Sequence, residues 1–103
     1  MSVSKQGIEI TNRFFQAIDI LKQQGKIRSL RQITEKYGLN YGNTHSLKTH
    51  PETYVLKPEL IAYLCLDFEI SSEWMMFGIE PIFINQTTSK VRNSYIKSTI
   101  QTQ

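Results

Sequence analysis

Residues 29–49 read SLRQITEKYGLNYGNTHSLKT, and this stretch decides the fold. Its first half places four residues at the i, i+3, i+4 and i+7 spacing of a helix face: Leu30, Ile33, Thr34 and Tyr37. Ser29 stands in the capping position, and Gln32 follows it three residues later, which is the pattern of a capping box. The pattern predicts a helix over Leu30–Tyr37 with this face turned inward.

A turn and a second helix complete the stretch. Gly38 is predicted to end the first helix in the left-handed conformation that glycine adopts most easily. Leu39 is expected to fill the angle between the two helices, and Asn40 to cap a helix over Tyr41–Thr49. A helix-turn-helix protein uses this arrangement to present its second helix to the major groove of DNA.

Three further helices are predicted outside this pair. The first covers Thr11–Gln24, with its inward face at Phe14, Phe15, Ile18, Leu21 and Lys22. The next has Pro58 in its first turn, where proline suits a helix. The last runs from a cap at Ser71 or Ser72 to Phe77, and Gly78 is expected to end it. No stretch alternates as a strand should, so the sequence predicts an all-α, compact five-helix bundle with a helix-turn-helix.

Charge and composition change along the chain. Residues 1–50 carry eight Lys/Arg against three Asp/Glu, residues 51–84 one against six, and residues 85–103 three against none. A basic face can hold a polyanion by displacing its counterions, although ordinary surface solvation gives the same pattern. Twelve of the last nineteen residues are Ser, Thr, Asn or Gln, which leaves little to bury. We therefore expect an N-terminal arm at 1–7, a folded domain at 8–84, and a polar C-terminal tail that is flexible or docks on a partner.

Several functional classes find little support in the sequence. A single cysteine, Cys65, cannot form an intrachain disulfide, which fits a reducing compartment. The N-terminus lacks the apolar core of a signal peptide, and no apolar stretch approaches a membrane span, so we expect a cytoplasmic protein. His45 and His50 lie five residues apart, which does not match a helical metal pair. Without a phosphate-binding loop, nucleophile elbow or carboxylate pair, the sequence predicts no metal, no cofactor and no enzyme.

Two stretches resemble a known family. Ser29 to Leu47 resembles the Cro/repressor-type, or lambda-repressor-like, helix-turn-helix family, through Ser29, Ile33-Thr34, Gly38, Leu39 and Asn40. Residues 70–78, ISSEWMMFG, resemble the closing helix of phage-repressor-like members, which typically reads Val-Ser, then Trp-Leu-Leu, then Gly. The resemblance covers residues 8–84. It departs from the family at Thr34, where alanine is usual, at Thr44, where an aliphatic residue is usual, and at Gly42, early in a helix.

The resemblance implies a regulator of transcription, a repressor of phage or mobile-element origin, that binds double-stranded DNA as a homodimer. With Thr44 and Leu47 facing inward, four residues are expected to read base edges: Tyr41, Asn43, His45 and Ser46. Asparagine can form two hydrogen bonds with adenine, whereas tyrosine more often contacts phosphate or sugar. Phosphate contacts are expected from four flanking residues: Arg28, Arg31, Lys48 and Thr49. For each of these side chains the alternative is a solvated surface residue.

A protein-interaction module, or an antitoxin-like adaptor, on the same fold is the competing interpretation. The acidic residues 51–84 and the polar tail would then be its working surfaces. The cluster Trp74 to Phe77 is expected to pack in the core or in a dimer rather than to bind a ligand. Cys65 is expected to be a small buried apolar residue rather than a nucleophile.

Overall fold

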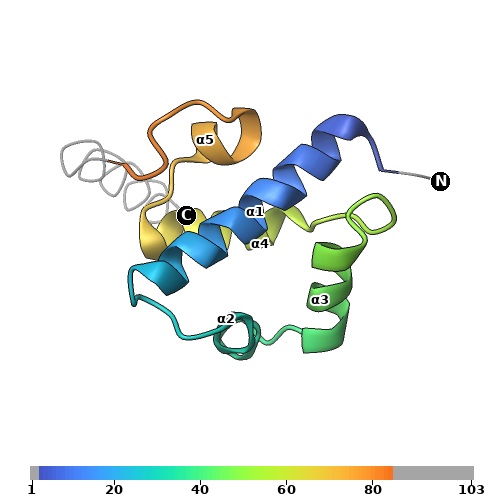
Figure 1. Cartoon of the computed structure of the whole chain (residues 1–103), viewed down its shortest axis with the longest axis horizontal. Helices are drawn as coiled ribbons and strands as arrows, with labels where there is room; N and C mark the ends of the chain where they lie inside the picture. Colours follow the sequence, from blue (N-terminus) through green and yellow to red (C-terminus); the bar gives the residue numbers. More distant parts are fainter. Residues whose placement is uncertain (1–2, 85–103) are drawn as a thin grey trace, which may run out of the picture.

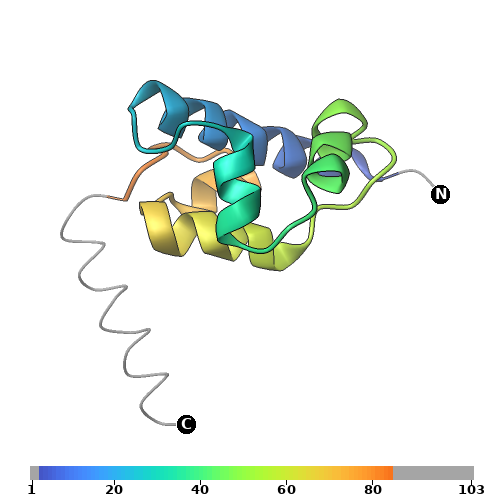
Figure 2. The same cartoon turned by 90° about the horizontal axis from the view of Figure 1, so that it is seen from below.

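The computed structural model describes residues 3–84, and this part of the chain forms five α-helices. They are α1 (Lys5–Gln23), α2 (Leu30–Lys36), α3 (Tyr41–Thr49), α4 (Pro58–Phe68) and α5 (Ser72–Phe77). In Figure 2, α1 and α4 lie on opposite sides of the body, and the three shorter helices lie around the space between them. The predicted all-α five-helix fold is confirmed for these residues. The predicted tail at 85–103 lies outside them.

The core fills the space between the helices with apolar side chains from all five. Its fully buried members include Phe14 and Leu21 of α1, Ile33 of α2, Leu64 of α4 and Met75 of α5. Each such side chain stabilises the fold by about 1.5–3 kcal/mol relative to an exposed one. Lys22, which the sequence analysis placed on the inward face of the first helix, is exposed, since burial of an unpaired ammonium is costly.

The first helix begins earlier than predicted. The Ser4 hydroxyl oxygen accepts a hydrogen bond from the Gly7 N–H at 3.1 Å, and this cap starts α1 at Lys5 rather than at Thr11. Glycine at position 7 avoids a close contact, because a Cβ there would lie 2.7 Å from a methyl group of Val3 and one of the two would have to shift. The last three residues of the predicted arm at 1–7 are therefore helical. The polar first turns of this helix conceal its spacing in the sequence.

Arg13 joins α1 to α5. Its Nε donates to the Met75 carbonyl at 2.7 Å, and its Nη2 donates to the Met76 carbonyl at 2.8 Å. The carbonyl groups at the end of a helix have no amide partners in their own helix, so the guanidinium satisfies two of them. α5 itself is capped by Ser71 and ends at the left-handed Gly78, as predicted.

Two more predictions concern burial. Trp74 and Met75 are in the core, whereas Phe77 is exposed, so the predicted packing role holds for only part of this cluster. Cys65 is buried, as expected. Among the described residues, no helix is both long enough and apolar enough to cross a membrane.

Candidate nucleic-acid interface

The start of α2 is fixed by two hydrogen bonds between side chains and the backbone. The Ser29 hydroxyl oxygen accepts from the Gln32 N–H at 3.3 Å, which confirms Ser29 as the cap. The Gln32 side chain reaches back as predicted, but it accepts from the N–H of Arg28 at 2.7 Å rather than from that of Ser29. The capping box therefore reaches Arg28, one residue before the cap. This bond holds the backbone of Arg28, a predicted phosphate contact, against the first turn of α2.

The turn between α2 and α3 depends on Gly38. Its φ of 67° lies in the left-handed region. The Gly38 N–H donates to the Glu35 carbonyl at 3.4 Å, and the Leu39 N–H donates to the Thr34 carbonyl at 2.7 Å. This pair of bonds is a Schellman motif, which satisfies the last carbonyls of α2. The chain then turns sharply: in Figure 1, α2 is seen end-on while α3 runs along the page.

The start of α3 explains the unusual Gly42. The Asn40 side-chain oxygen accepts from the Asn43 N–H at 2.9 Å, so Asn40 is the cap that the sequence predicts. A Cβ at position 42 would lie 3.2 Å from that same oxygen, a tight contact. Glycine therefore leaves room for the capping side chain. Its cost of about 1 kcal/mol in a helix interior, relative to alanine, is a reason to expect such a compensating role.

The two buried threonines, Thr34 and Thr44, are accommodated by hydrogen bonds from their hydroxyl groups to the backbone. The Thr34 hydroxyl donates to the Arg31 carbonyl, and the Thr44 hydroxyl donates to the Asn40 carbonyl, each at 2.9 Å. Both side chains are buried between α2, α3 and the core, yet neither leaves a polar atom unsatisfied. The departures from the family pattern at these two positions are therefore compatible with the helix-turn-helix geometry.

Thr44 and Leu47 face inward, as predicted, so the other side of α3 faces out. Of the four predicted base-reading residues, Asn43 and His45 are exposed, and Tyr41 and Ser46 are half-buried. The rings of Tyr41 and His45 stack with their centroids 6.0 Å apart. The Ser46 hydroxyl donates to the Gly42 carbonyl at 3.0 Å, which leaves its oxygen available as an acceptor.

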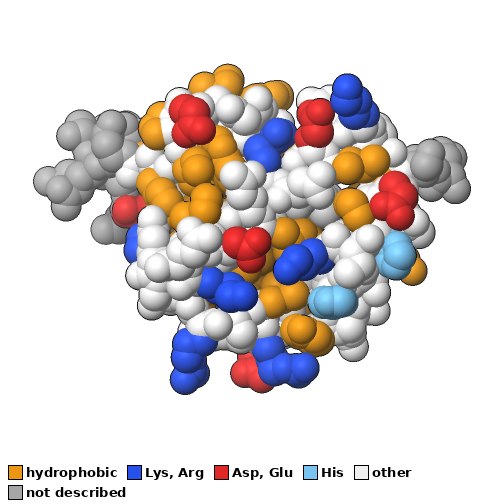
Figure 3. Space-filling model, viewed as in Figure 1, with side chains coloured by type: hydrophobic (Ala, Val, Ile, Leu, Met, Phe, Trp, Pro, Cys, Tyr) orange, Lys and Arg blue, Asp and Glu red, His pale blue; other side chains and the backbone are white. Residues whose placement is uncertain are grey.

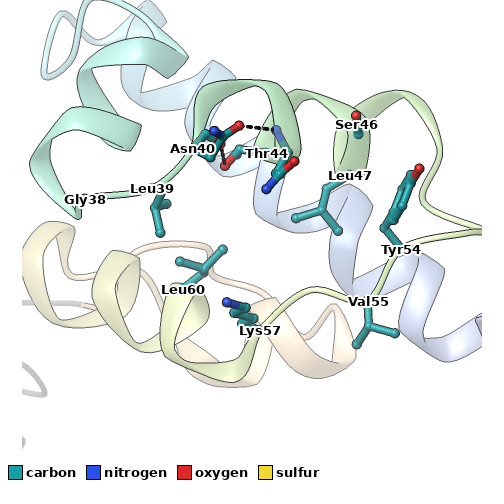
Figure 4. Close-up of a pocket in the computed structure, with 11 residues that line it drawn as sticks. Gly38, Leu39, Asn40, Thr44, Ser46, Leu47, Tyr54, Val55, Lys57 and Leu60 are labelled. Carbon is teal, nitrogen blue, oxygen red and sulfur yellow. Dashed lines mark hydrogen bonds between the residues drawn. The ribbon is translucent and has the colours of Figure 1, made fainter.

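The structure separates these four residues into two groups. Tyr41 and His45 form one, whereas Asn43 and Ser46 line a hollow of about 570 Å³ between α3 and the start of α4 (Figure 4). In Figure 4, Leu39 and Leu60 face each other at one end of the hollow, and Tyr54 and Val55 stand at the other. Its full lining is Gly38, Leu39, Asn40, Asn43, Thr44, Ser46, Leu47, Tyr54, Val55, Lys57 and Leu60.

Sequence reasoning missed three of the residues in this lining: Tyr54, Val55 and Lys57. It named none of these residues individually and included them only in the acidic stretch 51–84 of the competing interpretation. Tyr54 and Val55 are both exposed. Two large apolar residues next to each other in a solvent-facing loop were the signal that could have marked the segment.

Three of the four predicted phosphate contacts are cations. Within residues 3–84, no carboxylate lies within 4.0 Å of the side chain of Arg28, Arg31 or Lys48. Instead, the Arg31 guanidinium carbon lies 4.2 Å from the centre of the Tyr41 ring. The fourth predicted contact, Thr49, donates its hydroxyl to the His45 carbonyl at 3.2 Å. Figure 3 shows more Lys and Arg than Asp and Glu on the half of the molecule that contains α2 and α3.

Tyr37 anchors α2 on α4. Its hydroxyl donates to the Asp67 carboxylate at 2.5 Å, and its ring stacks on Tyr63 with centroids 4.5 Å apart. Lys36 pairs with the same carboxylate at 3.5 Å. Burial, followed by the hydrogen bond from Tyr37 to the negatively charged Asp67, raises the pKa of the Tyr37 phenol above its usual range. The phenol therefore stays protonated and can donate.

Metal ligands are not grouped in this region: residues 3–84 contain no cluster of three or more His, Cys, Asp or Glu side chains that could hold an ion. No family model matches the chain, and no curated protein or solved structure matches it. The resemblance of residues 8–84 to the lambda-repressor-like family therefore stays a prediction.

Proposed function

We propose that the protein is a sequence-specific regulator of transcription that binds double-stranded DNA with α3 in the major groove. The observation that carries the proposal is the unit formed by α2, the Gly38 turn and α3. Both helices are capped by side chains, and the second has a polar outward face beside cations that have no acidic partner within residues 3–84. This combination supports DNA binding more strongly than the fold alone, since one fold can serve many functions.

The dimensions of α3 suit the major groove. An α-helix with its side chains is about 10–12 Å in diameter, and the major groove of B-form DNA is about 12 Å wide. We assign base contacts to the four outward residues: Tyr41, Asn43, His45 and Ser46. We assign phosphate contacts to the flanking Arg28, Lys48 and Thr49. Phosphate contacts would position the helix, and base contacts would give the sequence preference.

A symmetric pair of chains would bind a palindromic site. In that arrangement each copy places one α3 in a half-site, and the half-sites lie about one helical turn, ~34 Å, apart. Occupation of such a site over a promoter would block transcription, which is the simplest action for a single small domain. Repression by a homodimer is therefore the form of the proposal that we favour.

Selection of duplexes from a random library, followed by fluorescence anisotropy, tests the proposal. We expect selected duplexes to bind more tightly than random ones at every salt concentration. The double variant His45→Ala/Ser46→Ala should lose that preference, because specific binding usually exceeds non-specific binding by at least about 10³-fold through base contacts. Ser72→Ala, an exposed change on α5, is the matched control and should bind as the wild type does. Equal binding to selected and random duplexes would contradict the proposal.

A protein-interaction module is the second candidate, and one observation favours it. Leu66, Phe77 and Ile79 are large apolar residues of the α4–α5 half with 49%, 64% and 52% of their surfaces exposed. Figure 3 shows hydrophobic atoms gathered on the surface over α5. The double variant Phe77→Ser/Ile79→Ser would abolish capture of a protein partner in this case, and it would leave the weak, unselective DNA binding unchanged.

A further inference from the structure

We propose that Arg31 reads a guanine of the DNA site, instead of holding a phosphate as the sequence analysis expects. The inference rests on the proposed function. It makes Arg31 and Tyr41 a single recognition unit, although they belong to different helices. The two residues lie ten positions apart in the sequence and meet only because the Gly38 turn folds α3 back against the start of α2.

The geometry of the pair carries the inference. The Arg31 guanidinium carbon lies 4.2 Å from the centre of the Tyr41 ring, well within the range over which a cation is attracted to an aromatic face. Tyr41 is the first residue of α3, so its ring lies at the end of the helix that enters the major groove in helix-turn-helix proteins. The stack therefore holds the guanidinium near base edges, not at the flank of the helix.

The donors of this guanidinium remain available. Its central carbon lies over the Tyr41 ring, and no carboxylate among residues 3–84 lies within 4.0 Å of its nitrogens. A guanidinium has five N–H groups in a rigid plane, and two of them can bond together to the O6 and N7 acceptors of guanine. The contact with Tyr41 restricts the arginine side chain before DNA arrives, which reduces the conformational entropy that binding must overcome.

The rest of the outward face of α3 offers no equivalent group. Among the exposed residues of α3 the one cation is Lys48, which lies in the last turn, away from the end of the helix that enters the groove, and its ammonium lacks the planar donor pair of a guanidinium. Asn43 suits adenine, because an amide matches one donor and one acceptor. Asn40 has its side-chain oxygen bonded to a backbone N–H. Guanine presents two adjacent acceptors, and Arg31 is the residue placed to donate to both.

The test uses a selected duplex in which 7-deazaguanine replaces one guanine at a time. This base pairs normally but lacks the N7 acceptor. For the wild-type chain, we expect one guanine in each half-site at which the replacement weakens binding about tenfold. Arg31→Met removes the donors but keeps most of the aliphatic length, so it should bind natural and modified duplexes equally. Arg28→Met, the matched change at a neighbouring arginine, should retain the tenfold difference.

The stacking partner is tested separately. Tyr41→Phe keeps the ring and should retain discrimination, whereas Tyr41→Leu should reduce it. The assignment is overturned if no single guanine is sensitive in the wild type, or if Arg31→Met keeps the wild-type sensitivity. In those cases, the proposed function stands as long as the wild type still prefers selected duplexes. Absence of that preference would overturn both. The wild-type scan needs no substitution, so a variant that fails to fold does not remove the test.

Discussion

The two halves of this domain bury different kinds of side chain. α2 and α3 each bury one aliphatic residue and one threonine, whereas α4 and α5 bury leucines, a cysteine, a tryptophan and a methionine. The first pair depends on side-chain caps, hydroxyl bonds and a glycine turn for its shape. The second pair depends mainly on apolar packing, with α5 lying against both α1 and α4. Under the proposed function, stability and recognition therefore belong to different parts of the domain.

This difference leads to the largest expected effect. Trp74 is 4% exposed and Phe77 is 64% exposed, although both lie on the six-residue α5. Trp74→Ala should lower the free energy of unfolding by about 3–5 kcal/mol, because it removes a core aromatic and leaves a cavity. Phe77→Ala, the matched change at an exposed site, should alter it by less than about 0.5 kcal/mol. Urea titration followed by circular dichroism measures both, and similar losses would contradict this assignment of the core.

The next effect compares two glycines, one of which is expected to set the position of α3 as well as to contribute to stability. Gly38 and Gly25 both have a positive φ, and neither would meet a neighbouring atom if a Cβ were added. Alanine at either site should cost about 1–2 kcal/mol of stability through backbone strain alone. Only Gly38→Ala should also weaken binding to the selected duplex, since its turn sets the position of α3. Equal DNA affinities for the two variants in anisotropy titrations would count against that role.

The smallest effect concerns the junction between the two halves. Because the pKa of the folded-state Tyr37 phenol is raised, its contribution to stability is present below the ordinary pKa of about 10 and is lost as the pH rises above it. Tyr37→Phe removes the bond to Asp67, so it should cost about 1 kcal/mol near neutral pH. Between pH 9 and about pH 11 the variant should lose less stability than the wild type does. If the melting temperatures of the wild type and of Tyr37→Phe fall in parallel as the pH rises, this bond does not link α2 to α4.

Much of this architecture could be predicted from local sequence. Ser29, Asn40 and Ser71 cap the helices that were expected to follow them, and Gly38 and Gly78 end the helices that were expected to precede them. Capping is a local effect over three or four residues, so a sequence reveals it. The predicted start of α1 was wrong, because the Ser4 cap is followed by a mostly polar first turn that does not show the apolar spacing of a helix face.

The remaining features depend on how distant segments meet. The stack of Arg31 on Tyr41 requires two helices to cross at a particular angle, and the hollow beside α3 requires a loop to fold against it. Neither property leaves a periodic trace in the sequence. The role of Gly42 is hidden for a similar reason, because it serves the side chain of a neighbouring cap.

The central claim is that α3 is the recognition surface. Titration of the ¹⁵N-labelled chain with a selected duplex, followed by amide chemical shifts, tests it most directly. We expect the largest changes in Tyr41–Thr49 and near Arg28 and Arg31, and little change in α5. Changes centred on Leu66, Phe77 and Ile79, or no saturable change at all, would contradict it.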